Sequence, residues 1–310
     1  MKVERSTVTK VARLVALALL LAALGFALSR NFHAVSKQIR TLSIGTLVWA
    51  ELAVLAGITS SMLAWRALLS DLGSPVSRLA AARIFFLGQL GKYVPGSVWP
   101  VVMQMELGAA MALPRTAVAT ASLLSIGVSL GAGTALALVT APALLATGSL
   151  WQWLLPPLGL IVLALLCVPP LMTRAVTIAL RVTRRTGITP AFSQRGLLAA
   201  VGWSVVSWLF IGIHVRMLAG ALGAHHDNLL ALSIGAMALA VSAGLVIVLA
   251  PAGAGVREVV LIGLLGQALP NSAAIALTLV SRLLLSVGDL TVALYALATT
   301  RQLRSRQGAS

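Results

Sequence analysis

The chain contains one cysteine, few acidic residues and few aromatic side chains among its 310 residues. The single cysteine, Cys167, excludes an intramolecular disulfide and a cysteine-based zinc site. Charged residues make up only 10% of the sequence, whereas a soluble domain usually has about 25%. No polar stretch is long enough to fold as a separate soluble domain. These shortages exclude a soluble protein and indicate an integral membrane protein.

Acidic residues are scarcer than basic ones, with 7 Asp and Glu against 23 Lys and Arg and a net charge of +16. In a soluble protein this excess would suggest a nucleic-acid partner. In a membrane protein it follows from the positive-inside rule and from attraction to anionic headgroups. Aromatic and basic residues do not alternate, so we expect the partner to be the membrane and not a nucleic acid.

Hydrophobic residues make up 59% of the chain, and they gather in runs long enough for spanning helices of about 20 residues. The predicted spans are Val11–Ser29, Leu42–Trp65, Thr116–Val139, Trp151–Val168, Gly196–Leu218 and Ala273–Thr299. The first follows a basic start and is interpreted as a retained signal anchor. We therefore predict an all-α, polytopic helical bundle with about six spanning helices, forming a single membrane domain over residues 1–310.

Two further apolar segments, residues 77–113 and 229–269, are interrupted by proline and glycine. The first break reads G-K-Y-V-P-G-S-V-W over residues 91–99, and the second reads P-A-G-A-G-V-R-E over residues 251–258. Backbone left unpaired in lipid costs several kcal/mol per group, so such breaks survive only when buried in protein or lining a polar cavity. We expect the functional site to lie at these breaks.

Loop charges set the predicted orientation. The regions predicted to be cytoplasmic are basic: residues 2–13, 66–83, 174–195 and 301–306. The loops predicted to be external are residues 140–150, which have no charge, and residues 219–228. In this orientation the loop at 30–40 should also be external although it is basic, and the other regions decide the orientation. The basic run Arg174–Arg185 predicts an amphipathic helix on the inner leaflet, with a solvated loop as the alternative. We expect an inner-membrane protein of a bacterium or archaeon with both termini in the cytoplasm.

This orientation requires both interrupted segments to return to the face from which they start. They are therefore predicted to be two opposed re-entrant hairpins, 77–113 from the cytoplasm and 229–269 from outside, in an inverted-repeat-like arrangement with a central site. The alternative is that one segment spans fully and the other is merely kinked.

The two breaks resemble the flippase-like membrane domain of the lysylphosphatidylglycerol synthase superfamily, whose motifs are roughly [KR]-Y-[ILV]-P-G-x-[VI]-W and P-G-G-x-G-x-R-E. The order and spacing of the motifs fit along nearly the whole chain, with one departure at Ala252, where the family usually has glycine. The resemblance implies translocation of a lipid or lipid-linked headgroup between leaflets. We expect the stand-alone membrane form without the synthase domain, so synthase activity is not carried over.

Charges inside a bilayer are costly, so each intramembrane ionisable residue is a functional candidate. The predicted substrate-binding residues lie at the breaks and in the last span: Lys92, Tyr93, Pro95, Gly96, Trp99, Pro251, Gly253, Gly255, Arg257, Glu258 and Arg282. Lys92, Arg257 and Arg282 would bind phosphate. Helix N-termini after each break would add free N–H groups, and Trp99 or Tyr93 would stack on a sugar. The expected ligand is an anionic phospholipid or a polyprenyl-phosphate-linked sugar.

Structural alternatives stand beside each assignment. Glu258 would hold Arg257 or bind a cationic headgroup, or the two residues merely satisfy each other. Lys92 would reach the interface instead, and Arg282 with Asp289, two turns apart, would form a structural salt bridge. Glu51 and Asp289 are candidates for proton coupling. For both Glu51 and Glu106, the sequence leaves a functional role and a packing role equally open.

Two other classes of function remain open. An intramembrane lipid-modifying enzyme would need a catalytic constellation, but no H-E-x-x-H or P-loop motif occurs, and His214 stands alone near the end of a span. A non-transporting partner of a lipid-linked glycosyltransferase would use small-residue contacts such as Gly127, Gly131 and Gly133. We expect no enzymatic activity, no cofactor and no metal; His225 and His226 are interpreted as a solvated loop.

Overall fold

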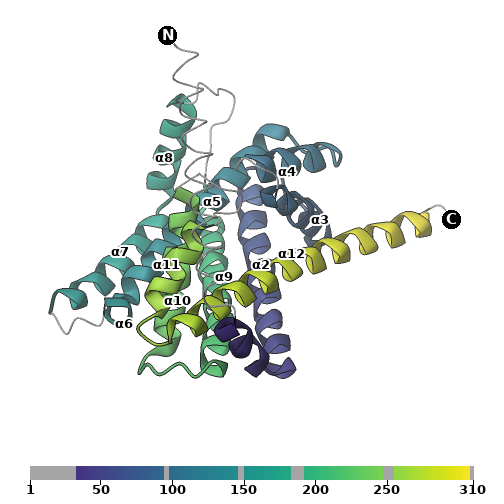
Figure 1. The fold of residues 1–310 in the computed structure, drawn as a ribbon. Helices are drawn as coiled ribbons and strands as arrows, with labels where there is room; N and C mark the ends of the chain where they lie inside the picture. The colour runs from purple at the N-terminus through teal and green to yellow at the C-terminus, as the bar shows by residue number, and fades with distance from the viewer. Residues whose placement is uncertain (1–32, 94–97, 146–149, 183–191, 247–254, 308–310) are drawn as a thin grey trace, which may run out of the picture.

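The computed structural model describes residues 33–93, 98–145, 150–182, 192–246 and 255–307. Within these ranges every regular element is helical, as Figure 1 shows, and this confirms the predicted all-α class. A short helix over residues 33–41 precedes the longer ones. The predicted anchor Val11–Ser29 lies outside the described residues.

Four helices of the described residues are each long and apolar enough to cross a bilayer: α2 (Ile44–Asp71), α5 (Arg115–Val139), α9 (Gln194–Ala221) and α12 (Asn271–Gln307) over its first part, to Thr299. They coincide with four of the predicted spans. Ser43 and Ser193 begin two of them by accepting the backbone N–H groups of Thr46 and Gly196, as N-cap serines do.

The predicted span Trp151–Val168 is not one straight helix. The chain leaves α5 through α6 (Ala141–Leu145) and forms η2 (Leu150–Leu154) and the 12-residue α7 (Leu155–Leu166), after which α8 (Pro169–Val182) departs at 77°. Pro169 and Pro170 explain the bend, because proline cannot continue the backbone ladder and disfavours a helical residue before it. The bent pair is the fifth candidate span, so the described residues supply four or five spans. The helix predicted over Arg174–Arg185 is present as α8, which begins earlier, at Pro169; residues 183–185 lie outside the described residues, and its place on the inner leaflet stays a prediction.

Helices α2 and α9 lie side by side and antiparallel through the middle of the bundle (Figure 1). At one end, Asp71 accepts hydrogen bonds from the Ser193 backbone nitrogen at 2.9 Å and the Ser193 hydroxyl at 2.7 Å. Farther along, the hydroxyl oxygens of Ser61 and Ser207 are 2.8 Å apart. A Cβ added at Gly57 would come within 2.9 Å of the Ile211 side chain, so small residues permit this close packing.

The segment 77–113 folds as a helical hairpin of α3 (Arg78–Gln89), the single turn η1 (Leu90–Tyr93) and α4 (Trp99–Ala109). Gly88 lies against Gln104 and Gly91 lies against Pro100, which makes the two helices antiparallel. The hairpin starts from the end of α2 and leads into α5, whose first turns also lie beside that end, because Trp65 Nε1 donates to Ser122 Oγ at 3.1 Å. Both ends of this hairpin therefore lie at the Asp71 end of the bundle.

The segment 229–269 folds as a second hairpin, made of α10 (Leu229–Val246) and α11 (Val256–Leu265). The backbone nitrogen of His225 donates to the carbonyl of Ala268 at 3.2 Å, so the chain enters and leaves this hairpin at one place. That place adjoins the end of α9, opposite Asp71. The two hairpins thus open toward opposite ends of the bundle. Their turns, residues 94–97 and 247–254, lie outside the described residues, and re-entry into a bilayer stays a prediction.

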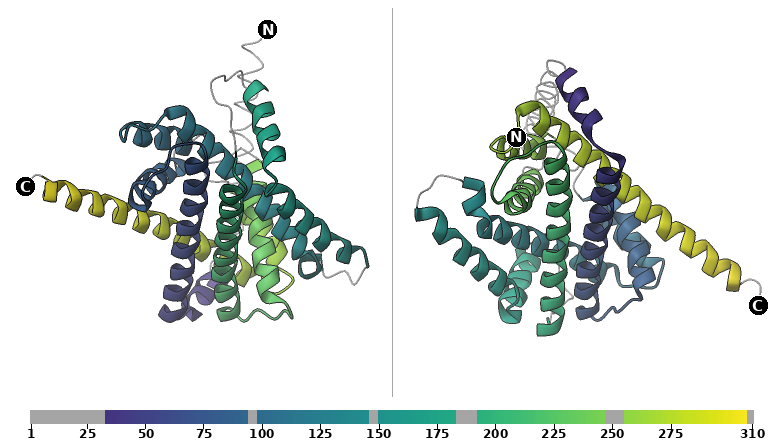
Figure 2. Two further views of the ribbon diagram at one scale, coloured as in Figure 1. Left: turned by 180° about the vertical axis from the view of Figure 1, so that it is seen from behind. Right: turned by 90° about the horizontal axis from the view of Figure 1, so that it is seen from below.

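Helix α12 crosses α2 and α9 obliquely and connects the two halves (Figures 1 and 2). Its early residues, including Ala274 and Leu277, are buried in a cluster with α9, α10 and α11. Its later residues Val292 and Ala296 are buried in a second cluster with α2, α3 and α5. One helix therefore packs against both hairpins, and this position decides where its charged residues lie.

Candidate functional site at the two breaks

The first break aims two side chains at α12. Because a Cβ at Gly91 would lie 2.7 Å from the backbone nitrogen of Pro100, glycine lets the turn η1 touch the start of α4. The two residues that follow Gly91 contact the same carboxylate: Lys92 Nζ lies 2.6 Å from Asp289 Oδ2, and the Tyr93 hydroxyl donates to that oxygen at 2.7 Å. The Lys92 ammonium also lies 5.6 Å from the centre of the Tyr93 ring.

Exposure is unequal across this ion pair. The Asp289 side chain is 3% exposed, whereas that of Lys92 is 32% exposed. The acid is therefore fixed inside the protein by two donors, while the base reaches toward open space. A competing anion can approach Lys92 without entering the core.

The second break is also tied to α12, through Glu258. Gly255 has a φ of 91°, a conformation that glycine adopts easily, and it begins α11. The Glu258 carboxylate accepts the Gly255 backbone N–H and pairs with the guanidinium of Arg282 on α12. Glu258 is 2% exposed and Arg282 is 40% exposed, which repeats the pattern of a buried acid with a more accessible base.

These pairs correct two sequence-based alternatives. Arg282 and Asp289 do not form a salt bridge with each other; each binds a different break. Glu258 pairs with Arg282 and not with its neighbour Arg257, because adjacent residues of a helix point about 100° apart. Arg257 instead places Nη2 3.8 Å from the sulfur of Met237 on α10.

Arg282 and Asp289 are seven residues apart on α12, or about 10 Å along its axis. Lys92 and Glu258, which come from opposite hairpins, are therefore held close together along one helix. The Arg257 guanidinium lies in the field of Glu258 and Arg282, and also of Asp289, which belongs to the other half of the site. The two breaks thus form one charged site instead of two separate ones.

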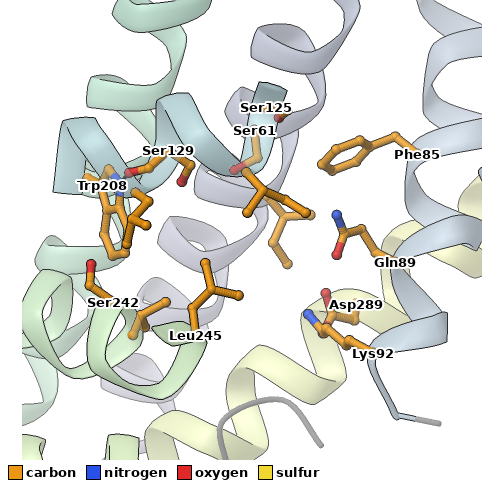
Figure 3. A pocket seen from close by; sticks show the side chains of 14 residues that line it. Ser61, Phe85, Gln89, Lys92, Ser125, Ser129, Trp208, Ser242, Leu245 and Asp289 are labelled. Carbon is orange, nitrogen blue, oxygen red and sulfur yellow. Dashed lines mark hydrogen bonds and ion pairs between the residues drawn. The ribbon is translucent and has the colours of Figure 1, made fainter. Parts of the chain in front are cut away.

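A cavity of about 210 Å³ adjoins the Lys92–Asp289 pair (Figure 3). Its polar lining comes from five helices and the turn η1: Ser61, Gln89, Lys92, Ser125, Ser129, Ser242 and Asp289. Phe85 and Trp208 contribute aromatic walls, and the Trp208 ring is fixed because Nε1 donates to the Ser129 carbonyl at 2.9 Å. Hydrophobic residues such as Ile126, Leu130 and Leu245 complete the lining, so the first break adjoins a space that has polar groups on mostly apolar walls.

Other predicted site residues have different positions. The side chain of Trp99 is 42% exposed at the start of α4. Glu106 forms an ion pair of 2.7 Å with Arg115, and both side chains are more than half exposed, so this acid lies on the surface. Pro95, Gly96, Pro251 and Gly253 lie outside the described residues.

His214, which sequence interpretation considered only as a lone histidine without a catalytic partner, has a structural role at this site. It is fully buried in α9; Nδ1 lies 2.5 Å from the Ile211 carbonyl and Nε2 lies 2.8 Å from Ser281 Oγ on α12. This contact fixes α12 immediately beside Arg282. The sequence contained a signal for this contact, because His214 is an ionisable residue inside a predicted span, where such residues are rare and normally paired.

The chain matches a family described as the lysylphosphatidylglycerol synthase TM region over residues 13–292. The match includes nearly all of the bundle and both breaks. The protein therefore belongs to this family of membrane domains, as its motifs indicated. No curated protein matches the chain.

Proposed function

We propose that this protein translocates a phosphate-bearing lipid, or a polyprenyl-phosphate-linked sugar, between membrane leaflets, and that it does so without enzymatic chemistry. The observation that supports this most is the pair of ion-paired breaks on α12, each with a buried acid and a more exposed base. Membership of a family named for a lipid synthase's membrane region agrees with a lipid substrate.

The ion pairs suggest how an anion would be bound. A phosphate competes with Asp289 for Lys92 and with Glu258 for Arg282, because charge-assisted hydrogen bonds to phosphate are strong and guanidinium groups bind it bidentately. Arg257 hydrogen-bonds a sulfur and not a carboxylate, so a phosphate can bind it without breaking an ion pair. Release of either pair would loosen one hairpin from α12 and so couple binding to movement.

Replacing Arg257 by methionine is expected to lower the rate of lipid transfer about tenfold or more. The reason is that a hydrogen bond to a charged group contributes about 1.5–3 kcal/mol. The measurement is transfer of fluorescent or sugar-bearing phospholipids between leaflets of reconstituted liposomes. Arg115→Met, which removes an exposed arginine far from the breaks, is the matched control. Wild-type transfer no faster than in empty liposomes, across several phosphate lipids, would sink the proposed function.

Of the candidates for proton coupling, Glu51 fits best. Both of its carboxyl oxygens are buried and lack a hydrogen-bond partner among the described residues, whereas Asp289 and Glu258 are each held by donors. A buried, unpaired carboxylate is costly, so a bound proton suits this position. Glu51 lies against Gly288 of α12, where Asp289, carrying Lys92 and Tyr93, acts on it electrostatically. A proton on Glu51 would therefore respond to whether Lys92 still neutralises Asp289.

In Glu51→Gln, we expect lipid transfer to continue but to lose its dependence on pH, because glutamine imitates the protonated acid and cannot release a proton. The measurement is the transfer rate in liposomes over a series of pH values, with Glu106→Gln as the control at an exposed acid. A pH profile identical to that of the wild type in Glu51→Gln would assign coupling to another residue.

A further inference from the structure

The cavity beside the Lys92–Asp289 pair has chemistry that the proposed phosphate contacts do not use. Four serine hydroxyls and the Gln89 amide line it, and Lys92 and Asp289 are its only charged lining residues among those described. A lysine ammonium has three N–H donors, so Lys92 can bind a phosphate while one donor stays on Asp289, which Tyr93 also holds. With that contact kept, this lining offers no free carboxylate to bind an ammonium group. Half of the lining residues are hydrophobic, among them Ile58, Leu130 and Leu245. The cavity therefore combines apolar walls with hydrogen-bonding groups, and its two charges cancel.

One lining group points to a ligand. The Ser242 hydroxyl on α10 is buried and has no hydrogen-bond partner in the described part of the chain. Buried hydroxyls are normally paired, and an unpaired one calls for an explanation. In Figure 3, Ser242 and Ser129 lie on one side of the cavity, next to Trp208, with Gln89 on the other side and the ion pair at its edge. Hydrogen-bonding groups therefore surround the space from several directions.

The size of the cavity indicates what it can hold. It offers about 210 Å³ of space and is partly open on one side. This is enough for a compact headgroup and too little for a lipid with its chains. Aromatic rings at Phe85 and Trp208 offer apolar faces to a ring or carbon chain whose hydroxyls hydrogen-bond to serine and glutamine.

We infer that this cavity is a headgroup site for an uncharged, hydroxyl-bearing group, a glycerol, cyclitol or sugar, attached to the phosphate that Lys92 binds. The inference rests on the proposed function for the position of the phosphate. It adds a substrate class: hydroxylated anionic lipids are preferred over bare phosphate lipids and over lipids with an ammonium headgroup.

The test is native mass spectrometry of the full-length protein released from micelles with equal amounts of competing lipids. The hydroxylated probes are phosphatidylglycerol, phosphatidylinositol and a polyprenyl phosphoryl hexose; phosphatidic acid and phosphatidylethanolamine are the comparison. We expect each hydroxylated class that fits to be retained about three- to tenfold more than phosphatidic acid, the effect of one or two hydrogen bonds. The ranking within the hydroxylated probes then distinguishes a glycerol from a sugar.

Two variants test whether the preference for hydroxylated lipids comes from this cavity. Ser242→Ala and Gln89→Met are expected to lower it at least twofold each, while Ser233→Ala leaves it unchanged, because that buried serine of α10 hydrogen-bonds the Leu229 carbonyl and does not line the cavity. Equal retention of phosphatidic acid by the wild type, stronger retention of phosphatidylethanolamine, or no effect of either cavity variant overturns the inference. Transfer is measured separately: a preference in binding without any transfer refutes the proposed function and leaves the headgroup site standing.

Discussion

Replacing Lys92 with methionine is expected to lower the free energy of unfolding by about 3 kcal/mol, because it leaves the buried carboxylate of Asp289 without its cation. Asp289 is 3% exposed and would keep only the Tyr93 hydroxyl as a donor. The same variant should lose lipid transfer, because the ammonium proposed to bind phosphate is gone. Thermal unfolding in detergent and transfer in liposomes measure the two effects.

A second substitution separates stability from function. In Lys92→Met combined with Asp289→Asn, no charge is left unpaired and the amide oxygen still accepts from Tyr93, so we expect most of the stability to return while transfer remains lost. Arg115→Met, at an exposed pair, is the control and should change stability by less than about 1 kcal/mol. If the double variant regains transfer, Lys92 is not a phosphate ligand. If Lys92→Met costs no more than the control, the pair does not hold the hairpin.

Gly91→Ala is expected to destabilise the protein by about 2 kcal/mol, within the range for overpacking of a tight contact. The new Cβ would lie 2.7 Å from backbone atoms of Trp99 and Pro100, and backbone cannot rotate away as a flexible side chain can. The start of α4 would have to shift, which displaces the turn that positions Lys92 and Tyr93. Transfer should therefore fall even in the fraction that remains folded.

Gly202→Ala is the matched control, because no atom lies within 4 Å of a Cβ built at this position of α9. Alanine should there raise helix stability by about 1 kcal/mol, a change of the opposite sign. Thermal unfolding of the two variants side by side makes the comparison. Equal stability of Gly91→Ala and the wild type would mean that α3 and α4 separate at little cost.

Hydropathy and charge were sufficient to predict the helical class and the two interrupted segments, because long apolar runs and basic loops are local properties of the sequence. The bend between α7 and α8 was also marked locally, by Pro169 and Pro170. It was not predicted because hydropathy, averaged over a window, does not change where a helix bends. The charged residues of the site were found because charge is rare inside apolar segments. Lys92, Glu258, Arg282 and Asp289 were all selected on that ground.

The pairing of these charges was beyond the sequence. Tyr93 and Asp289 are 196 positions apart, and nothing in either segment specifies which base meets which acid. The buried network in which Ser122 donates to Gln104 and accepts from Trp65 shows the same limit, since three ordinary polar residues from α5, α4 and α2 meet only after folding. The contact of His214 with Ser281 was not predictable for the same reason, because Ser281 lies on another helix.

The charges gathered at α12 have a consequence for the response to membrane voltage. Among the described residues, Lys92, Arg257 and Arg282 lie with the carboxylates of Glu258 and Asp289, so these five groups together carry one positive charge while the neighbouring Glu51 holds its proton. On the proposed function, a phosphodiester brings one negative charge and makes the loaded site neutral. An electrical potential across the bilayer, worth about 2.3 kcal/mol per charge per 100 mV, would then act on the return of the empty carrier and leave the loaded step nearly unaffected.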